Sequence, residues 1–285
     1  MSVHPAVWAL GALVVLAVSS RAARAAGAAG AAALGPAPVL GTGRTDLARL
    51  EARWGDPQIR AAAERWGARF FPGVPVSAML AAGITSTSRT ERGGPPDYAT
   101  GLYGVELRRA EAWAADAQTL TELGRAVDTS ASAFGRDVDA QTYLGFRSYR
   151  AHLDACVRAI PAELRPAEGS PWLWRLAVAS YSSGEGAVSG TVRGADLAQL
   201  VAAEHRWTAL GRAVVAAHAA GRRTIGTVPI SGRWRAAYLL LRCERRFRAG
   251  LALALAVPEL AAERRWYAGD ELPVDLAREL EALAP

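Results

Sequence analysis

Two short segments of this chain combine acidic, aromatic and glycine residues in a pattern that suits acid–base chemistry. In the first, Glu91 follows an apolar, helix-like run and precedes Gly93-Gly94 and the segment Gly-Leu-Tyr-Gly-Val-Glu at residues 101–106. A carboxyl group at the edge of a packed helix loses solvent, and desolvation raises its pKa toward neutrality. The paired glycines leave room for a polymer to approach. These features predict a general acid for glycan cleavage at Glu91.

The second segment, Ala-Ser-Tyr-Ser-Ser-Gly-Glu-Gly-Ala-Val at residues 179–188, closes an apolar helix-like run that begins at Trp172. A second carboxylate helps glycoside cleavage by orienting a water molecule or by offsetting developing positive charge. Glu106 and Asp97 are the candidates for that role. The competing interpretation is that Glu91 is an ordinary solvated glutamate at the end of a helix.

Together the two segments resemble the lysozyme-like superfamily, in particular the soluble lytic transglycosylases and goose-type lysozymes. Those families carry a catalytic Glu-Ser followed by Gly-Leu-Met-Gln, and later an Ala-Tyr-Asn-Ala-Gly-x-Gly segment that lines the substrate groove. The resemblance implies that Glu91 is the general acid and base, and that Glu106 matches the acidic residue found after the goose-type motif. It implies a groove lined by Gly101, Leu102, Tyr103, Tyr181, Ser182, Ser183 and Gly184.

The chain departs from that family pattern at several positions. Arg92 stands where the family has Ser, Gly104 where it has Gln, and Ser182 where it has Asn. The short gap after Glu91 is closer to the glucosaminidase relatives, whose Phe-Gly-Ile segment residues 103–105 resemble. The chain contains no asparagine at all, which accounts for Ser182 but not for Gly104.

The composition limits the choice of partners. All 33 basic residues are arginine, which is typical of a genome rich in G and C, and the net charge is +6. A positive charge favours an acidic partner, such as a cell-wall polymer or an anionic membrane surface. The arginines form no dense run, and no zinc-finger, basic-zipper or RNA-binding motif is present, so no specific nucleic acid is expected.

The N-terminal region predicts export or membrane attachment. Residues 6–18 are apolar and uncharged, and with their flanks approach the length of about 20 residues that a membrane span requires. Residues 23–25, Ala-Arg-Ala, fit a signal-peptide cleavage site. We therefore expect a signal peptide or anchor at residues 1–25, an Ala/Gly/Pro linker at 26–43 and the folded domain at 44–285. A buried or assembly-embedded apolar helix is the alternative for the first segment.

The folded region reads as mainly α, because apolar residues recur at steps of three and four and β-branched runs are short. We expect helices over residues 46–69, 76–90, 106–127, 137–160, 172–181, 195–220, 232–256 and 269–285. The first of these is interrupted at Asp56-Pro57. Residues 71–75 read as a turn and 224–228 as a short extended connection. With the resemblance, this gives a lysozyme-like helical domain behind an N-terminal apolar helix and linker.

No cofactor or metal is expected. Cys156 and Cys243 lie in apolar helical patterns without His or Cys at ligand spacing, which favours buried thiols, although export would allow a disulfide between them. Trp172 and Trp174 read as core residues, with sugar stacking as the alternative.

The predicted function is cleavage of the β-1,4 glycan strands of peptidoglycan at the cell envelope by a single glutamate. Attack by water would make the protein a lysozyme-type hydrolase, and attack by the sugar's own hydroxyl would make it a lytic transglycosylase. The setting could be a host envelope, a virion or a secretion machine. The main alternative is a non-catalytic helical component of an envelope or virion assembly, and a nucleic-acid-associated protein is a third.

Overall fold

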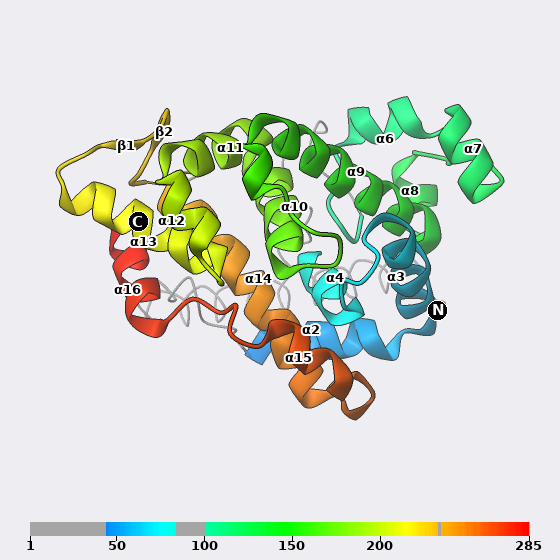
Figure 1. The fold of residues 1–285 in the computed structure, drawn as a ribbon. Helices are drawn as coiled ribbons and strands as arrows, with labels where there is room; N and C mark the ends of the chain where they lie inside the picture. Colours follow the sequence, from blue (N-terminus) through cyan, green and yellow to red (C-terminus); the bar gives the residue numbers. More distant parts are fainter. Residues whose placement is uncertain (1–43, 84–100, 233–234, 285) are drawn as a thin grey trace, which may run out of the picture. The chain divides into compact units, whose positions relative to one another are not determined.

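The computed structural model describes residues 44–83, 101–232 and 235–284, and regular structure within these ranges is almost entirely helical (Figure 1). The prediction of a mainly α chain is thus confirmed. Four parts of the chain lie outside the described residues: 1–43, with the predicted export segment and linker; 84–100, with Glu91 and Asp97; 233–234; and 285. Within the described ranges, no helix combines the length and the apolar character that crossing a bilayer requires.

The first two helices of the described residues are separated where the sequence predicts a break. Helix α2 (Arg44–Gly55) and helix α3 (Pro57–Phe70) are separated by Asp56. The Asp56 carboxylate accepts hydrogen bonds from the backbone N–H groups of Gln58 (2.9 Å) and Ile59 (3.2 Å), as an N-cap residue does. A turn at residues 71–75 then leads into helix α4 (Val76–Ala82), which is buried almost throughout.

Helix α9 is the long central element of the middle region and packs against α3, α10 and α11. Its apolar positions are buried at the predicted three- and four-residue steps, for example Tyr143, Phe146 and Tyr149. The predicted helix at 106–127 is instead two short helices, because Asp116 caps a new start. The helices of this region are α6 (Leu107–Trp113), α7 (Ala117–Leu123), α8 (Ala131–Phe134) and α9 (Val138–Ala159).

The C-terminal half differs from the prediction at several places. Residues 195–220 form two helices with a break at residues 203–205. A helix at 185–194 and short helical segments at 162–164, 258–263 and 264–267 were not predicted. The elements are η1 (Ala162–Leu164), α10 (Pro171–Ser183), α11 (Glu185–Gly194), α12 (Leu197–Ala202), α13 (Arg206–Ala219), the antiparallel pair β1 (Thr224–Ile225) and β2 (Val228–Pro229), α14 (Ala236–Ala256), η2 (Pro258–Glu263), α15 (Arg264–Tyr267) and α16 (Val274–Leu283).

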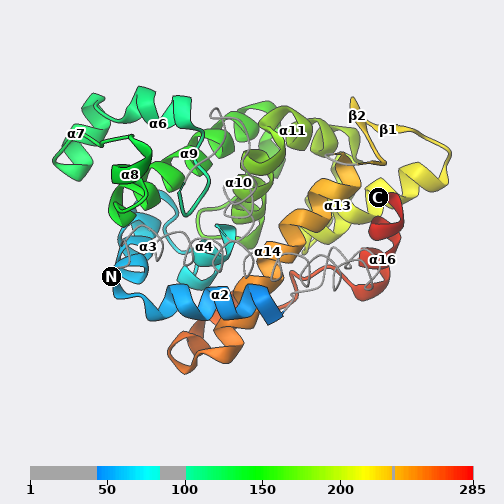
Figure 2. The ribbon, with the colours of Figure 1, turned by 180° about the vertical axis from the view of Figure 1, so that it is seen from behind.

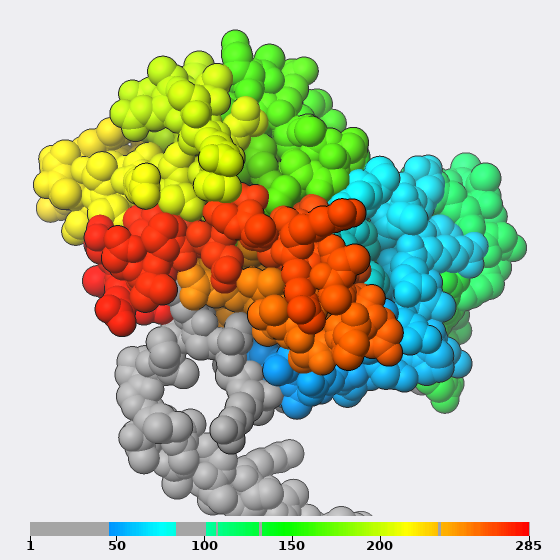
Figure 3. Space-filling model, turned by 60° about the horizontal axis from the view of Figure 1, so that its bottom comes forward, coloured from blue at the N-terminus to red at the C-terminus, as the bar shows by residue number. Residues whose placement is uncertain are grey.

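Helix α14 joins the early and late parts of the chain, because it packs against α4, α10 and α16 (Figures 1 and 2). The Ser77 and Tyr267 hydroxyl groups, 190 residues apart, lie 2.7 Å from each other, and Arg245 pairs with Asp46 at 2.6 Å. On the face seen in Figure 3, the C-terminal segment in red lies between the yellow and orange segments that contain α13 and α14. The core is therefore closed by residues late in the sequence.

A buried ion pair ties α10 to α14. The Arg175 and Glu244 side chains are 1% and 0% exposed, and Arg175 Nη1 lies 2.7 Å from Glu244 Oε2. The other Glu244 oxygen accepts from Arg248 Nε (2.8 Å) and from the backbone N–H of Leu272 (3.0 Å). Arg175 also donates to the backbone carbonyl of Asp270. Each charged group is therefore both paired and hydrogen-bonded.

The two cysteines and the two tryptophans of α10 are core residues. Cys156 and Cys243 are buried free thiols, as the apolar pattern favoured, and burial raises the pKa of Cys243 to about 12. Trp172 and Trp174 are 7% and 3% exposed, so neither offers a ring face to a sugar.

Candidate functional site

The structure brings the two segments singled out in the sequence into direct contact. Tyr181, in the last turn of α10, donates a hydrogen bond from its hydroxyl to the backbone carbonyl of Gly104, which lies 77 residues earlier. This bond joins the Gly-Leu-Tyr-Gly segment to the Tyr-Ser-Ser-Gly segment. No local spacing in the sequence requires that contact.

Residues 101–104 form a tight turn that depends on its glycines. Gly101 and Gly104 have φ angles of +77° and +66°, in the left-handed region that favours glycine. The backbone N–H of Leu102 donates to Gln141 Oε1 (2.8 Å) on α9. Tyr103 is 1% exposed and packs its ring 4.7 Å from that of Phe146. Tyr103 therefore anchors the turn in the core, and its side chain does not form the surface wall that the resemblance implies.

Arg53 fixes the turn to the end of α4. Its guanidinium donates to the carbonyl of Leu80 (3.1 Å) and reaches the carbonyls of Gly83 and Leu102, each at 3.5 Å. Burial lowers the pKa of Arg53, because desolvation disfavours its charged form. Arg53 thus holds residues on both sides of the 84–100 segment at one point.

Two stacked tyrosines support the turn from the other side. The rings of Tyr149 and Tyr181 lie 4.1 Å apart at an interplanar angle of 23°. The Tyr149 hydroxyl donates to the carbonyl of Ala82 (3.2 Å), the last residue of α4. Burial raises the pKa of both phenols, so they remain protonated hydrogen-bond donors.

The residues after Tyr181 end α10 and start α11. The Ser182 hydroxyl donates to the carbonyl of Val178 (2.7 Å) and accepts from Arg246. The Ser183 hydroxyl is buried without a hydrogen-bond partner among the described residues. Gly184 has a φ of +85°, in the region that favours glycine. The backbone conformation is the reason for glycine here, because a Cβ atom at this position would meet no other atom within 4 Å.

Four charged or titratable side chains gather beside this contact. Arg109 Nη1 lies 2.6 Å from His152 Nε2, and His152 Nδ1 lies 2.9 Å from Glu185 Oε2. Arg109 Nε lies 3.8 Å from Glu106 Oε2. Burial, with Arg109 as the next cause, lowers the pKa of His152. A hydrogen bond from its own backbone N–H, helped by His152, lowers the pKa of Glu185.

Sequence reasoning placed Glu106 in this group but missed Arg109, His152 and Glu185. Glu185 stands inside the quoted motif, and His152 follows Tyr149 by about one helical turn, so their positions were visible in the sequence. Their association was not, because the three residues come from α6, α9 and α11. Only the folded chain places them together.

Of the two acidic residues predicted to be catalytic, the structure describes Glu106 but not Glu91. Glu106 precedes α6 and its side chain is 60% exposed, which suits a carboxylate that orients water. Glu91, the predicted general acid, lies outside the described residues. Within the described ranges, no three His, Cys, Asp or Glu side chains are grouped so as to hold a metal ion.

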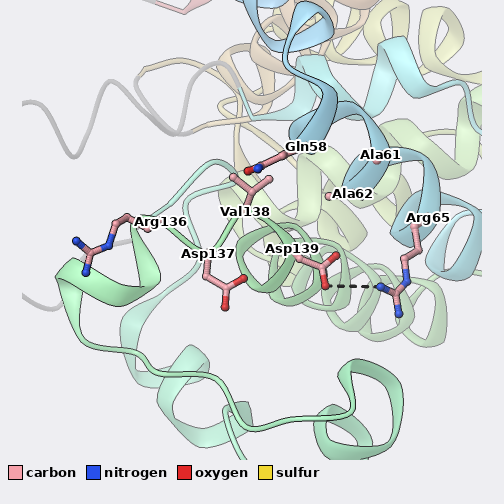
Figure 4. A pocket seen from close by; sticks show the side chains of 8 residues that line it. All are labelled: Gln58, Ala61, Ala62, Arg65, Arg136, Asp137, Val138 and Asp139. Atoms are coloured by element: carbon pink, nitrogen blue, oxygen red, sulfur yellow. Dashed lines mark ion pairs between the residues drawn. The ribbon is translucent and has the colours of Figure 1, made fainter.

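A cavity of about 330 Å³ lies elsewhere, between α3 and the start of α9 (Figure 4). It contains the ion pair of Arg65 with Asp139, at 3.7 Å. Its lining comprises Gln58, Ala61, Ala62, Arg65, Arg136, Asp137, Val138 and Asp139. None of the predicted site residues is among them.

Comparison with known protein families, with curated proteins and with solved structures finds no match to this chain. The site is therefore interpreted from its own geometry.

Proposed function

We propose that the surface where residues 101–106 meet residues 181–185 binds glycan strands of peptidoglycan, and that the protein cleaves their β-1,4 bonds. The observation that supports this most is the hydrogen bond from Tyr181 to Gly104. In the lysozyme-like families that the sequence resembles, the two corresponding segments line one substrate groove. The proposal includes a lysozyme-like arrangement of the helices and an exported or membrane-anchored protein.

The chemistry assigns separate roles to the two acidic residues. Glu91 protonates the leaving oxygen and then acts as the base, which requires a carboxylic acid with a raised pKa. Glu106 is exposed beside Arg109, so its carboxyl group is placed to orient water or to offset positive charge. The hydrogen bonds from Arg53 and to Gln141 hold the turn rigid, which suits a wall for a polymer. The net charge of +6 suits an anionic cell wall.

One observation favours a second function, that of a non-catalytic structural protein of an envelope or virion assembly. Tyr103, Trp172 and Trp174 are 1%, 7% and 3% exposed, so none of these aromatic rings is available to stack on a sugar. A surface that lacks such rings suits a structural contact as well as it suits a substrate groove.

Digestion of purified peptidoglycan by the full chain, followed by mass analysis of the fragments, tests the proposal. We expect cleavage by the wild type, loss of about 100-fold or more in Glu91→Gln, as general acid catalysts contribute, and a smaller loss in Glu106→Gln. Glu111→Gln, an exposed residue of α6, is the matched control and should cleave normally. Anhydro products would identify a transglycosylase, and reducing ends a hydrolase. Absence of cleavage by the folded wild type would favour the structural protein.

A further inference from the structure

The contact between Arg109 and His152 fixes the protonation state of the histidine. A guanidinium group can only donate hydrogen bonds. With Arg109 Nη1 at 2.6 Å, His152 Nε2 must therefore be the acceptor and carry no proton. The proton of the neutral ring is then on Nδ1, which donates to Glu185 Oε2 at 2.9 Å. Arg109 thus donates to His152, and His152 donates to Glu185.

Groups from every neighbouring helix face this histidine. Arg109 comes from α6 and Glu106 from the position just before it, and α11 contributes Glu185. Helix α10 contributes the Tyr181 ring, edge-on at 5.5 Å, and Tyr149 and Cys156 flank His152 on α9 itself. The His152 side chain is 11% exposed and that of Arg109 is 30% exposed. The histidine is therefore enclosed, whereas the guanidinium that it holds reaches the surface.

We propose that His152 is a positioning residue for the glycan site: its neutral ring holds Arg109 at the surface beside Glu106, where the guanidinium donates to oxygen atoms of the glycan. This inference rests on the function proposed above. A protonated ring would place an N–H against the N–H of Arg109, and the hydrogen bond would be lost. Glycan binding should therefore weaken as the pH falls through the titration of His152.

The groups around His152 support the expectation that glycan binding weakens as the pH falls. Burial and the charge of Arg109 lower its pKa from the ordinary value, so the ring is neutral at pH 7. Arg109 Nε already lies 3.8 Å from Glu106 Oε2, and once the bond to His152 is lost the guanidinium can close on this carboxylate, which takes its donors away from the glycan. Ser148 Oγ, at 3.4 Å from Nη1, is too distant to hold the guanidinium alone.

The test measures binding of the full chain to soluble, uncleaved peptidoglycan glycan strands from pH 7.5 down to pH 4, in the Glu91→Gln background to prevent cleavage. We expect binding to become about tenfold weaker once His152 is protonated, the size of one hydrogen bond to a charged group. In His152→Gln the amide oxygen can accept from Arg109 and the amide N–H₂ can donate to Glu185, without titrating. This variant should bind well throughout this pH range, whereas His152→Phe should bind weakly throughout it. His218→Gln, an exposed histidine of α13, is the matched control and should retain the pH dependence.

Binding in His152→Gln that falls with pH as in the wild type would overturn the inference, as would full affinity in His152→Phe. A second measurement needs no glycan: ¹⁵N NMR of the imidazole and guanidinium nitrogens during a pH titration. We expect an Nδ1–H tautomer at pH 7.5 and a shift of the Arg109 signals that follows the His152 titration. A protonated Nε2 at pH 7.5 would overturn the inference. Absence of glycan binding with the expected NMR result would instead show that the proposed function is wrong.

Discussion

The hydroxyl of Tyr181 donates a hydrogen bond to the backbone carbonyl of Gly104, and the ring that carries it is stacked on Tyr149. Tyr149 in turn binds the carbonyl of Ala82. The end of α4, the turn before α6 and the end of α10 are thus joined through two aromatic side chains. The position of the 101–104 turn depends on these contacts as much as on its own glycines.

Replacing Tyr181 by Phe should reduce the free energy of unfolding by about 1–2 kcal/mol, because the buried carbonyl of Gly104 would lose its partner. Tyr103→Phe is the matched control, since its buried hydroxyl has no partner in the described part of the chain. That change should alter stability by no more than about 0.5 kcal/mol. Urea unfolding of both variants measures the difference, and equal losses would contradict the role given to Tyr181.

Gly145→Ala should displace the 101–104 turn. A Cβ atom at Gly145, on α9, would lie 2.7 Å from Cβ of Tyr103, which is too close for the two atoms to coexist. Overpacking of this kind costs about 1–3 kcal/mol. At Gly55 a Cβ would meet nothing within 4 Å, so Gly55→Ala should be neutral or slightly stabilising. Thermal unfolding of the two variants checks the contrast, and a stable Gly145→Ala would show that the turn can move freely.

Glu244→Gln should be strongly destabilising, by about 3 kcal/mol or more, because it leaves the buried guanidinium of Arg175 without its counter-charge. Asp154→Asn removes an ion pair with Arg150 whose Asp154 side chain is 47% exposed, and should cost less than about 0.5 kcal/mol. Denaturant titration of both variants at pH 7 gives the comparison. Similar losses in the free energy of unfolding would mean that burial does not determine how much each ion pair contributes to stability.

Asp116 should contribute a pH-dependent part of the stability. Hydrogen bonds from Arg147 (2.6 Å) and from the backbone N–H of Thr119 (2.8 Å) lower its pKa to about 2, from an ordinary value of 3.8. A lowered native pKa stabilises the fold above pH 4, and this contribution disappears as the pH falls toward 2. Asp116→Asn should therefore be less stable at pH 5 but lose less stability between pH 5 and pH 2. Parallel urea midpoints for both proteins would contradict this.

Local signals in the sequence were sufficient for much of the fold. The N-cap at Asp56 followed by Pro57 located the break between α2 and α3, and the spacing of Tyr143, Phe146 and Tyr149 located α9. Each of these signals acts within one or two helical turns. The secondary structure that they specify does not depend on distant residues.

Helix α11 escaped prediction because its glycines weaken the helical pattern. Gly194 is required by the β1–β2 connection, since a Cβ there would lie 2.0 Å from the backbone nitrogen of Gly226. A Cβ at Gly190 would meet the Val228 side chain at 2.8 Å. These glycines are required for packing between distant segments. Their low helix propensity argues against a helix, so a prediction from local sequence misses α11.

The site was only partly predictable for the same reason. The motifs containing Gly104 and Tyr181 were recognised as a pair through a family resemblance, whereas the hydrogen bond between them follows from the fold. Tyr103 was expected at a surface, but its ring fills the core against Phe146. Arg109, His152 and Glu185 come from three helices, and no spacing along the chain relates them.

The packing of α4 against α14 has a consequence for synthesis of the protein. Helix α4 spans Val76–Ala82, whereas its main partner spans Ala236–Ala256, and the Ser77 contact with Tyr267 lies later still. A chain emerging from the ribosome therefore carries apolar residues of α4 that only α2, α3 and α9 can contact until translation is nearly finished. Contacts of such long range also slow folding, because the intervening loop must close first. The core around α4 can therefore be completed only after the C-terminal half of the chain has been synthesised.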